Sequence, residues 1–275
     1  MKRRRADEAL FEDLNLESIA LARALIMEGR VMAGDRKILS VSEALRPQDQ
    51  LRVRGELDSY VSRGAYKLKK AVEVFGIDLR DRVCIDVGSS TGGFTDVMLR
   101  AGAKRVYCID VGYNLLDYKI RSDPRVTAME RVNARFIRPE DFPVRPSFGA
   151  TDVSFISLRA ILPAALSVLT GDCEFVALIK PQFEAPKEDV GERGVVRDRN
   201  VHLRVVRDIL SFVPETGWRA EGLSYSPVRG QEGNIEFLLH LKKGAEIESK
   251  IDEAAINDII TAAYDNFFKS AKQGL

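Results

Sequence analysis

From about residue 65 onward, short apolar runs typical of strands alternate with longer amphipathic runs typical of helices. The strand-like runs lie at 82–88, 105–111, 126–130, 148–155 and 173–181, with two more at 218–227 and 234–241. The clearest helical runs lie between or before them, at 66–76, 94–102 and 202–217. Such alternation is typical of βαβ units around a parallel sheet. We therefore expect an α/β domain over residues 65–245, with a mostly parallel sheet and helices on both faces.

The residues before this domain have a different pattern. Two helical runs, at 6–14 and 17–30, precede two short strand-like runs at 31–39 and 49–55. This pattern predicts a small α+β unit over residues 1–57, joined to the α/β domain by a linker at 58–64. At the other end, residues 246–275 form a tail that is amphipathic from about Asp252 and is expected to be helical.

Composition excludes several classes of protein. The 42 Lys and Arg nearly balance the 41 Asp and Glu, but basic residues cluster at 2–5 and 67–70, so a nucleic-acid partner is not excluded. The cysteines Cys84, Cys108 and Cys173 lack metal-ligand spacing, which favours reduced thiols and no metal site. No signal core is visible and no run approaches the roughly 18 apolar residues of a membrane helix. We expect a cytoplasmic protein with no membrane partner.

The segment CIDVGSSTGGFTD, residues 84–96, carries the first candidate chemistry. Its glycines allow the backbone to approach a ligand closely. No Gly-Lys-Ser/Thr follows, so the segment is not a phosphate-binding P-loop, and its spacing is not the dinucleotide fingerprint. The ligand should therefore be something other than ATP or NAD.

A second acidic residue narrows the choice of ligand. Asp110 ends the strand that follows the glycine segment, where a carboxylate can accept hydrogen bonds from a ribose diol. A glycine loop and a ribose acid without a phosphate lysine indicate a nucleoside cofactor that lacks a pyrophosphate. S-adenosylmethionine fits this description. The alternative is that the glycines form only a tight turn and that Asp110 caps a helix.

Four charged residues stand at or near element ends that should meet at one crevice: Lys67, Asp152, Lys180 and Glu236. Methyl transfer to a hydroxyl requires in-line geometry and a way to remove the hydroxyl proton. Lys180 ends an apolar strand, where burial and neighbouring cations would favour its neutral, proton-accepting form. The alternative for each residue alone is a solvated charge at a strand end.

Other polar and aromatic residues favour structural interpretations. Lys69 and Lys70 are expected to be solvated or to contact RNA phosphates. His202 and His240 have no partner motif, so we interpret them as structural, and we expect Trp218 to pack in the core.

Seven blocks in order carry a family resemblance: YVSRGAYKLKKA, DVGSSTGGFTD, VYCIDVGYNLL, ERVNAR, TDVSFISL, IKPQFE followed by VGERGVVRD, and GNIEFLL. Together they resemble the TlyA-type proteins, often named hemolysin A, which are ribosomal RNA ribose methyltransferases related to the heat-shock 2′-O-methyltransferases. The resemblance ends before the C-terminal tail. It implies a Rossmann-like S-adenosylmethionine-dependent methyltransferase domain behind a small N-terminal α+β RNA-binding domain.

The resemblance also implies roles for the charged residues. The family's lysine-aspartate-lysine-glutamate tetrad corresponds to Lys67, Asp152, Lys180 and Glu236. Lys180 would be the base or would lower the pKa of the hydroxyl, and Asp152 would tune the pKa of Lys180. Lys67 and Glu236 would position the nucleophile. Sequence alone does not decide which member accepts the proton, because a coupled cluster titrates as a unit.

The cofactor site follows from the same resemblance. Asp110 would bind the ribose and Asn133, in the ERVN block, the adenine. The residues expected around the methionine end are Asp86, Gly88, Ser89, Gly92, Gly93, Phe94 and Thr95.

The first unit resembles an RNA-binding module first described in a small-subunit ribosomal protein. Its usual valine-asparagine-glycine turn is replaced by residues 32–35, Met-Ala-Gly-Asp, which places one asparagine contact in doubt. The expected phosphate contacts come from arginines, and ribosomal RNA or ribosomal subunits would be the partner. These arginines are Arg3, Arg4, Arg5, Arg23 and Arg36.

Two competing functions remain from other classes. The first is an RNA-binding protein with a vestigial cofactor site, against which the intact tetrad argues. The second is a secreted pore-forming hemolysin, which the absence of a recognisable signal or membrane-inserting segment disfavours. The oligomeric state, the nucleotide and the ribosomal subunit are not specified by the sequence.

Overall fold

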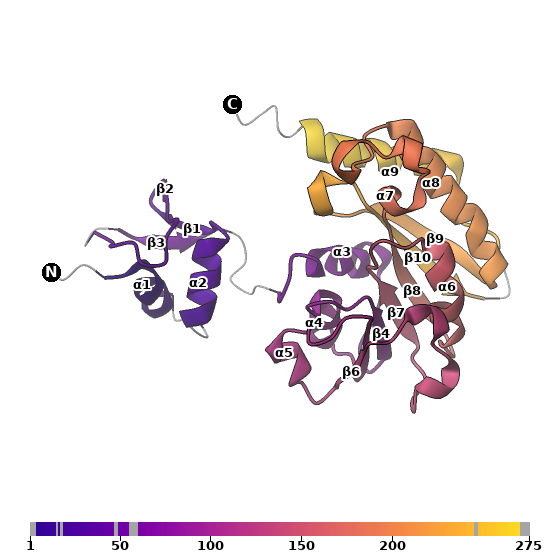
Figure 1. The fold of residues 1–275 in the computed structure, drawn as a ribbon, viewed down its shortest axis with the longest axis horizontal. Coiled ribbons are helices and arrows are strands. Elements are labelled where there is room, and N and C mark those ends of the chain that lie inside the picture. Colours follow the sequence, from indigo (N-terminus) through magenta and orange to yellow (C-terminus); the bar gives the residue numbers. More distant parts are fainter. Residues whose placement is uncertain are drawn as a thin grey trace. The chain divides into compact units, whose positions relative to one another are not determined.

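The computed structural model describes residues 4–14, 16, 19–46, 49–54, 60–244 and 247–269. The chain divides into two compact units, Met1–Ser59 and Tyr60–Leu275 (Figure 1). The second unit is the larger of the two and carries the motifs that the sequence associates with chemistry.

The first unit is a helix pair with a small antiparallel sheet. Its elements are α1 (Ala6–Asp13), α2 (Ile19–Met27), β1 (Val31–Ala33), β2 (Arg36–Lys37) and β3 (Leu51–Val53). The strand order is β2-β1-β3. The turn between β1 and β2 places Gly34 at φ +61°, a conformation that favours glycine. Apolar side chains from both helices and from β1, among them Leu10, Leu25 and Val31, form its core. This is the helix pair and strand layer that the sequence predicts.

The second unit is built on a seven-stranded sheet. Its strands are β4 (Val83–Val87), β5 (Arg105–Asp110), β6 (Val126–Glu130), β7 (Phe148–Thr151), β8 (Glu174–Ile179), β9 (Trp218–Tyr225) and β10 (Phe237–Lys243). The order across the sheet is β6-β5-β4-β7-β8-β10-β9. The strands β4 to β8 pair in parallel, and β10 is antiparallel to both of its neighbours. Strand order reverses between β4 and β7, which is where open α/β sheets bind ligands.

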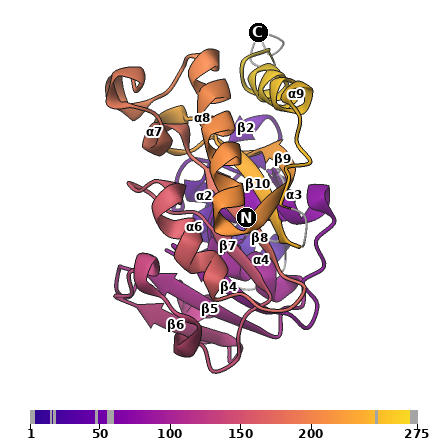
Figure 2. The ribbon, with the colours of Figure 1, turned by 90° about the vertical axis from the view of Figure 1, so that its right-hand side faces the viewer.

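Helices cover both faces of this sheet. They are α3 (Ala65–Phe75), α4 (Gly93–Arg100), α5 (Tyr118–Arg121), α6 (Leu158–Ser167), α7 (Pro181–Glu184), α8 (Arg199–Phe212) and α9 (Glu253–Tyr264), followed by a π-helical turn (Asp265–Lys269). Figure 2 shows α6 and α8 over one face of the sheet. Helices α3 and α4 pack on the opposite face. The predicted α/β class and Rossmann-like arrangement are confirmed.

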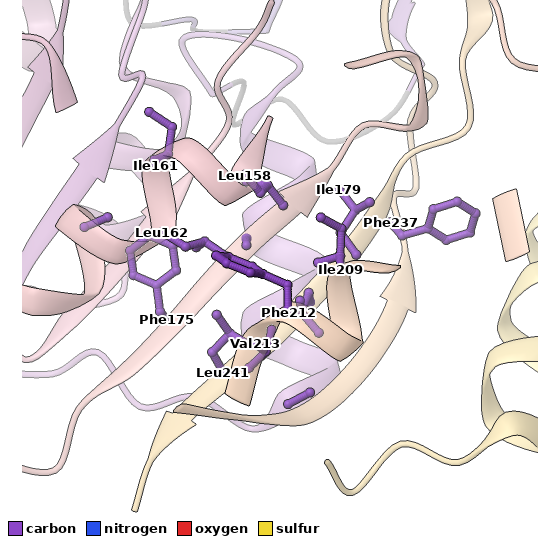
Figure 3. Close-up of a cluster of buried hydrophobic side chains, with 14 of the residues drawn as sticks. Leu158, Ile161, Leu162, Phe175, Ile179, Ile209, Phe212, Val213, Phe237 and Leu241 are labelled. Carbon is purple, nitrogen blue, oxygen red and sulfur yellow. The ribbon is translucent and has the colours of Figure 1, made fainter. Parts of the chain in front are cut away.

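Strand residues alternate between two cores, as the twofold period of a β-strand requires. In β4, Cys84 faces the core under α3 and α4, whereas Ile85 faces the core under α6 and α8. Figure 3 shows the second core, in which strand side chains meet side chains from α6, α8 and the turn after α8. The labelled residues are Leu158, Ile161, Leu162, Phe175, Ile179, Ile209, Phe212, Val213, Phe237 and Leu241. Each such side chain stabilises the fold by about 1.5–3 kcal/mol when fully buried.

Both ends of the second unit pack against the rest of that unit. Residues 60–64, which the sequence assigns to the linker, lie in this unit, where the backbone N–H of Val61 donates to Asp96 at 3.0 Å. Helix α9, expected as part of a tail, packs into the core through Ile256, Ile260 and Ala263. Trp218 is buried in the same core. In the pairing of β9 with β10, β9 carries one extra residue, Glu221.

Candidate active site

The sheet brings three of the four candidate catalytic residues to one edge and one face, and helix α3 supplies the fourth. Asp152 follows β7 and Lys180 follows β8 at their carboxyl ends, and Glu236 precedes β10 at the same edge because β10 is antiparallel. The pairing of Phe237 with Ile179 brings Glu236 opposite Lys180. Since Phe237 and Ile179 face the core under α6 and α8, their neighbours face the other side. Helix α3 covers that side and supplies Lys67.

The four side chains form one chain of ion pairs. Glu236 Oε2 lies 2.8 Å from Lys67 Nζ, and the same nitrogen lies 3.0 Å from Asp152 Oδ2. The other oxygen of that carboxylate, Oδ1, lies 2.6 Å from Lys180 Nζ. Lys67, Lys180 and Glu236 are all buried. The four residues are therefore not the separate solvated charges of the alternative interpretation.

The ion pairs determine the protonation states of Lys67 and Asp152. Burial alone would lower the pKa of Lys67, but the carboxylates of Asp152 and Glu236 outweigh it and raise that pKa. Burial likewise acts to raise the pKa of Asp152, and the two ammonium groups outweigh it and lower that pKa. Lys67 and Asp152 are thus held charged, and Lys180 contacts a carboxylate rather than only the neighbouring cations that the sequence suggested.

A cavity of about 310 Å³ opens beside this chain of ion pairs. It is lined by the tetrad, by Asp86 and the glycine loop, and by residues that sequence reasoning did not select. These additional residues include Ser62, Ser154, Gln182 and Phe183. Lys180 donates to Ser154 Oγ at 3.0 Å. Ser154 lies in the TDVSFISL block, but neutral hydroxyls are common at strand ends and gave no separate signal.

The glycine loop connects β4 to α4 and passes close to other segments of the same unit. Gly92 has φ +92°, and a Cβ there would lie 2.9 Å from Ile120 Cγ2. A Cβ on Gly93 would lie 2.2 Å from Ser62 Oγ, so neither position has room for a side chain without displacing a neighbour. Gly88, Ser89, Gly93 and Phe94 line the cavity beside the tetrad. Gly92 is absent from the described lining of the cavities and acts by shaping the turn.

Asp86 anchors this loop from beneath. Its Oδ2 accepts hydrogen bonds from the backbone N–H of Thr95 at 2.9 Å and from the Thr95 hydroxyl at 2.7 Å. Burial nevertheless raises the pKa of Asp86 to about 7. Because Thr95 is fully buried, it supports Asp86 rather than reaching the ligand space. The carboxyl of Asp86 borders the cavity and would be stabilised as a carboxylate by a bound cation.

A second, larger cavity of about 750 Å³ adjoins the first and shares Gly88, Ser90, Asp152 and Ser154 with it. Asp110 and Asn133 line it, as the sequence predicts for ribose and adenine contacts. Its apolar wall was not predicted and includes Leu115, Val132, Val153, Phe155 and Ile156. Apolar walls with a few convergent polar groups are typical of small-molecule sites.

Two backbone groups hold the carboxylate of Asp110. Its Oδ1 accepts from the N–H of Gly112 at 2.7 Å and its Oδ2 from the N–H of Ser90 at 2.9 Å. Asp110 therefore ties its own loop to the glycine loop while each oxygen keeps a further lone pair. Asn133 accepts from the N–H of Arg135 at 3.1 Å and so caps the short 3₁₀ turn that follows it.

The candidate RNA-binding arginines of the first unit are paired with carboxylates. Arg4 lies 2.7 Å from Asp13, and Arg36 pairs with Glu43 and Asp49. These arginine side chains remain 45–49% exposed. Arg3 lies outside the described residues.

Arg5 and Arg23 share one buried partner, Asp7, at 3.1 Å and 2.8 Å. Hydrogen bonds from Arg5 and then Arg23 outweigh the effect of burial and lower the pKa of Asp7 to about 2. The pair is therefore part of the unit's framework, with both guanidinium groups about half exposed.

Two basic residues on α3 also have partners. Lys69 lies 3.5 Å from Glu73. Lys70 is not a solvated lysine: its Nζ lies 3.3 Å from the ring centroid of Tyr225, and burial lowers the pKa of Lys70 to about 8. The two histidines are buried, His240 beside Glu174 at 2.8 Å and His202 beside Tyr264 at 3.0 Å, away from the tetrad cavity.

No helix in the described part of the chain is long and apolar enough to cross a membrane. Within the same residues, no group of three or more His, Cys, Asp or Glu side chains could hold a metal ion.

Known proteins are similar to this chain over most of its length. A relative from Bacillus subtilis, named as the rRNA methyltransferase YqxC, is 46% identical over 241 residues, which cover 87% of this chain and 86% of the relative. The 16S/23S rRNA (cytidine-2′-O)-methyltransferase TlyA of Mycobacterium tuberculosis is 39% identical over 242 residues, covering 88% and 90%. A solved structure from Streptococcus thermophilus, named as a hemolysin, is 40% identical, covers 99% of both chains and has a TM-score of 0.79.

The second unit accounts for the family match. The model that matches is described as FtsJ-like methyltransferase and spans residues 60–243, from the segment before α3 to the end of β10. This span contains the glycine loop, the four charged residues and both cavities. The chain belongs to the FtsJ-like methyltransferase family.

Proposed function

We propose that this protein transfers a methyl group from S-adenosylmethionine to the 2′-hydroxyl of a ribose in ribosomal RNA. The observation that carries the proposal is the buried chain of ion pairs from Glu236 through Lys67 and Asp152 to Lys180, beside a cavity that adjoins a second, larger one. The names of the Bacillus subtilis and Mycobacterium tuberculosis relatives support ribosomal RNA as the substrate. Such a substrate places the protein in the cytoplasm.

The residues present fit S-adenosylmethionine. The larger cavity, about 750 Å³, lies within the usual range of about 300–1,000 Å³ for small-molecule sites. Asp110 would accept hydrogen bonds from the ribose diol, and Val132, Asn133 and Ile156 would enclose the adenine. Asp86 and the Gly88–Ser89 backbone would hold the methionine end, with the carboxylate of Asp86 facing its ammonium.

The methyl group that the cofactor supplies is electrophilic because its sulfur is positively charged. The protein's task is to present the ribose oxygen in line and to remove its proton. Lys180 Nζ lies 2.6 Å from Asp152 Oδ1 and donates a hydrogen bond to Ser154 Oγ at 3.0 Å. Lys180 also lines the cavity beside the tetrad. We assign Lys180 two alternative roles: as a neutral amine it would accept the ribose proton, and as an ammonium it would stabilise the negative charge that develops on the ribose oxygen.

Lys67 and Glu236 would position the nucleophile. Lys67 donates a hydrogen bond to Asp152 and forms an ion pair with Glu236, and an ammonium group has three N–H donors, so one of them would bind the incoming hydroxyl oxygen. The raised pKa of Lys67 keeps this donor charged at neutral pH. Asp152 binds both lysines and so fixes the distance between the donor and the proton acceptor.

The first unit would place the RNA. Exposed ion pairs such as Arg4–Asp13 are weak because solvent screens them, so the arginine can exchange its carboxylate for a phosphate at little cost. Such contacts position the protein on RNA without reading sequence. Arg4, Arg5, Arg23 and Arg36 are the described candidates, and Arg3 remains a sequence-based one.

One experiment tests the function directly. The purified protein, S-adenosylmethionine and ribosomal subunits from cells lacking this gene are incubated together, and ribose methylation is mapped along the ribosomal RNA. We expect 2′-O-methylation with the wild type and none with Asp152→Asn, a variant of nearly the same size. Methylation of a base, or no methylation with a protein that binds cofactor and RNA, would contradict the proposal. The second result would favour an RNA-binding protein with a vestigial site.

A further inference from the structure

The segment Tyr264–Phe268, which we call the C-terminal brace, contacts a loop that leads into the active site. Arg229 in this loop donates a hydrogen bond to the backbone carbonyl of Phe267. Its guanidinium carbon also lies 5.0 Å from the ring centroid of Phe267 and 4.7 Å from that of Phe268. Together these contacts favour one position of the loop relative to the brace.

The loop held by Arg229 forms a wall against Glu236. A Cβ on Gly230 would lie 2.0 Å from Glu236 Oε1, so the loop backbone packs directly on the carboxylate. The N–H of Ser226 donates to the carbonyl of Glu236 at 2.8 Å, and the N–H of Gly230 donates to that of Asn234 at 2.9 Å. The position of the loop therefore fixes the position of the Glu236 side chain.

The brace also reaches the other member of the Lys67–Glu236 pair. The ring of Tyr225 packs edge-on against Phe267, with centroids 6.2 Å apart, and Lys70 Nζ lies 3.3 Å from the Tyr225 centroid. Lys70 follows Lys67 by one turn of α3. One segment thus supports both the loop behind Glu236 and the helix that carries Lys67.

The brace is itself fixed to the body of the unit. The hydroxyl of Tyr264 donates to the carbonyl of Arg197 at 2.9 Å, and α9 is buried at Ile256 and Ile260. A fixed brace transmits its position to the loop because packed side chains resist displacement.

We propose that the C-terminal brace is a positioning element for the Lys67–Glu236 ion pair, acting through Arg229 and Tyr225. This inference rests on the proposed methyl transfer. The residues of the brace are absent from the described lining of the two site cavities, so we expect it to act through Arg229 and Tyr225 and not through contact with the reacting groups. Its loss should therefore slow transfer without weakening cofactor binding.

The test is Arg229→Ala in the full chain, with Arg207→Ala as the matched control. Arg207 pairs with Glu253 of α9, so the control also removes an arginine contact to the C-terminal helix but leaves the loop alone. For Arg229→Ala we expect kcat to fall about tenfold or more, with KM for RNA and Kd for S-adenosylhomocysteine within about twofold of wild type. For Arg207→Ala we expect wild-type kcat at a comparable melting temperature.

A second variant places the effect on Glu236. Gly230→Ala should displace the same carboxylate, so the double variant with Arg229→Ala should be no slower than the slower single variant. Wild-type kcat in Arg229→Ala, or an equal loss in Arg207→Ala, would overturn the inference. So would multiplicative losses in the double variant.

An NMR measurement separates this inference from the proposed function. The side-chain ammonium resonance of Lys67 in ¹⁵N-labelled protein should shift or broaden in Arg229→Ala and remain unchanged in Arg207→Ala. An inactive wild type would contradict the proposed methyl transfer. The resonance would still decide whether the brace positions the ion pair, and an unchanged signal in Arg229→Ala would overturn that claim.

Discussion

Lys180 donates a 3.0 Å hydrogen bond to the hydroxyl of Ser154, a residue at the junction of the two cavities. A lysine side chain has four rotatable bonds, so a single ion pair leaves its nitrogen free to swing about its partner. The bond to Ser154 provides a second fixed direction. In the proposed mechanism, Ser154 would therefore orient Lys180 toward the ribose oxygen.

Ser154→Ala should lower kcat about tenfold and leave affinity for S-adenosylhomocysteine nearly unchanged. A hydrogen bond to a charged group contributes about 1.5–3 kcal/mol, and part of it is expected to be replaced by water. Ser154→Thr keeps the hydroxyl and should recover most of the rate. Single-turnover transfer measures the rate, and an alanine variant as fast as the threonine variant would remove the orienting role.

Lys180→Arg should bind cofactor and RNA normally but lose methyl transfer by about 10²-fold or more, the usual scale of general-base catalysis. Arginine keeps the positive charge but does not release its proton in a protein. Lys180→Ala should be no faster. Lys69→Arg, on the helix that carries Lys67, is the matched control and should retain activity. If Lys180→Arg turned over near the wild-type rate, charge alone would suffice and the base would be water or another tetrad member.

Asp110→Ala should weaken binding of S-adenosylhomocysteine by about 1–3 kcal/mol, the cost of losing hydrogen bonds to the ribose diol. The substitution also releases the N–H groups of Ser90 and Gly112. Asp110→Asn keeps one acceptor oxygen and should lose less. Calorimetric titration distinguishes these variants, and wild-type affinity in Asp110→Ala would refute the ribose assignment.

Cofactor affinity should rise with pH through about 7 because of Asp86. Burial raises the pKa of Asp86 to about 7, so its carboxyl is largely neutral at pH 6 and largely ionised at pH 8. Only the carboxylate pairs with the cofactor's ammonium, so the affinity for S-adenosylhomocysteine should be about tenfold higher at pH 8 than at pH 6. Asp86→Asn should bind weakly with little dependence on pH. A pH-independent wild type would show that Asp86 does not face the ammonium.

Removal of residues 1–59 should weaken RNA binding and reduce its salt dependence while leaving cofactor affinity intact. For each RNA phosphate that the shortened chain no longer neutralises, the slope of log K against log salt should become shallower by about 0.7–0.9. Circular dichroism and calorimetry with S-adenosylhomocysteine establish that residues 60–275 remain folded. Unchanged RNA affinity in the shortened chain would contradict the division of work between the two units.

The sequence predicts the acids and bases at strand ends well because their placement depends on local pattern. Asp110 and Lys180 each end a β-branched apolar run, and the carboxyl ends of parallel strands share one edge. Glu236 is different because it begins its strand. It reaches the same edge only because β10 is antiparallel, which follows from tertiary pairing and not from local pattern.

What the sequence could not predict depends on contacts between distant segments. Lys70 resembles any exposed lysine of an amphipathic helix until β9 brings Tyr225 over it. Ser62 and Ser154 are small polar residues without a distinctive spacing, and only the folded chain places them on the cavity. The ion pair of Arg23 with Asp7 likewise depends on the packing of α1 against α2.

The alternation of β8 and β10 between two faces makes catalysis sensitive to strand register. One residue inserted into β8 before Ile179 would rotate Lys180 to the face covered by α6 and α8, although the sheet itself could still form. The outer strand is under less constraint, because β9 already accommodates Glu221 as an extra residue. Changes in length should therefore accumulate in β9 and in the loops during divergence, whereas β8 and β10 should keep their lengths even where their apolar residues are exchanged.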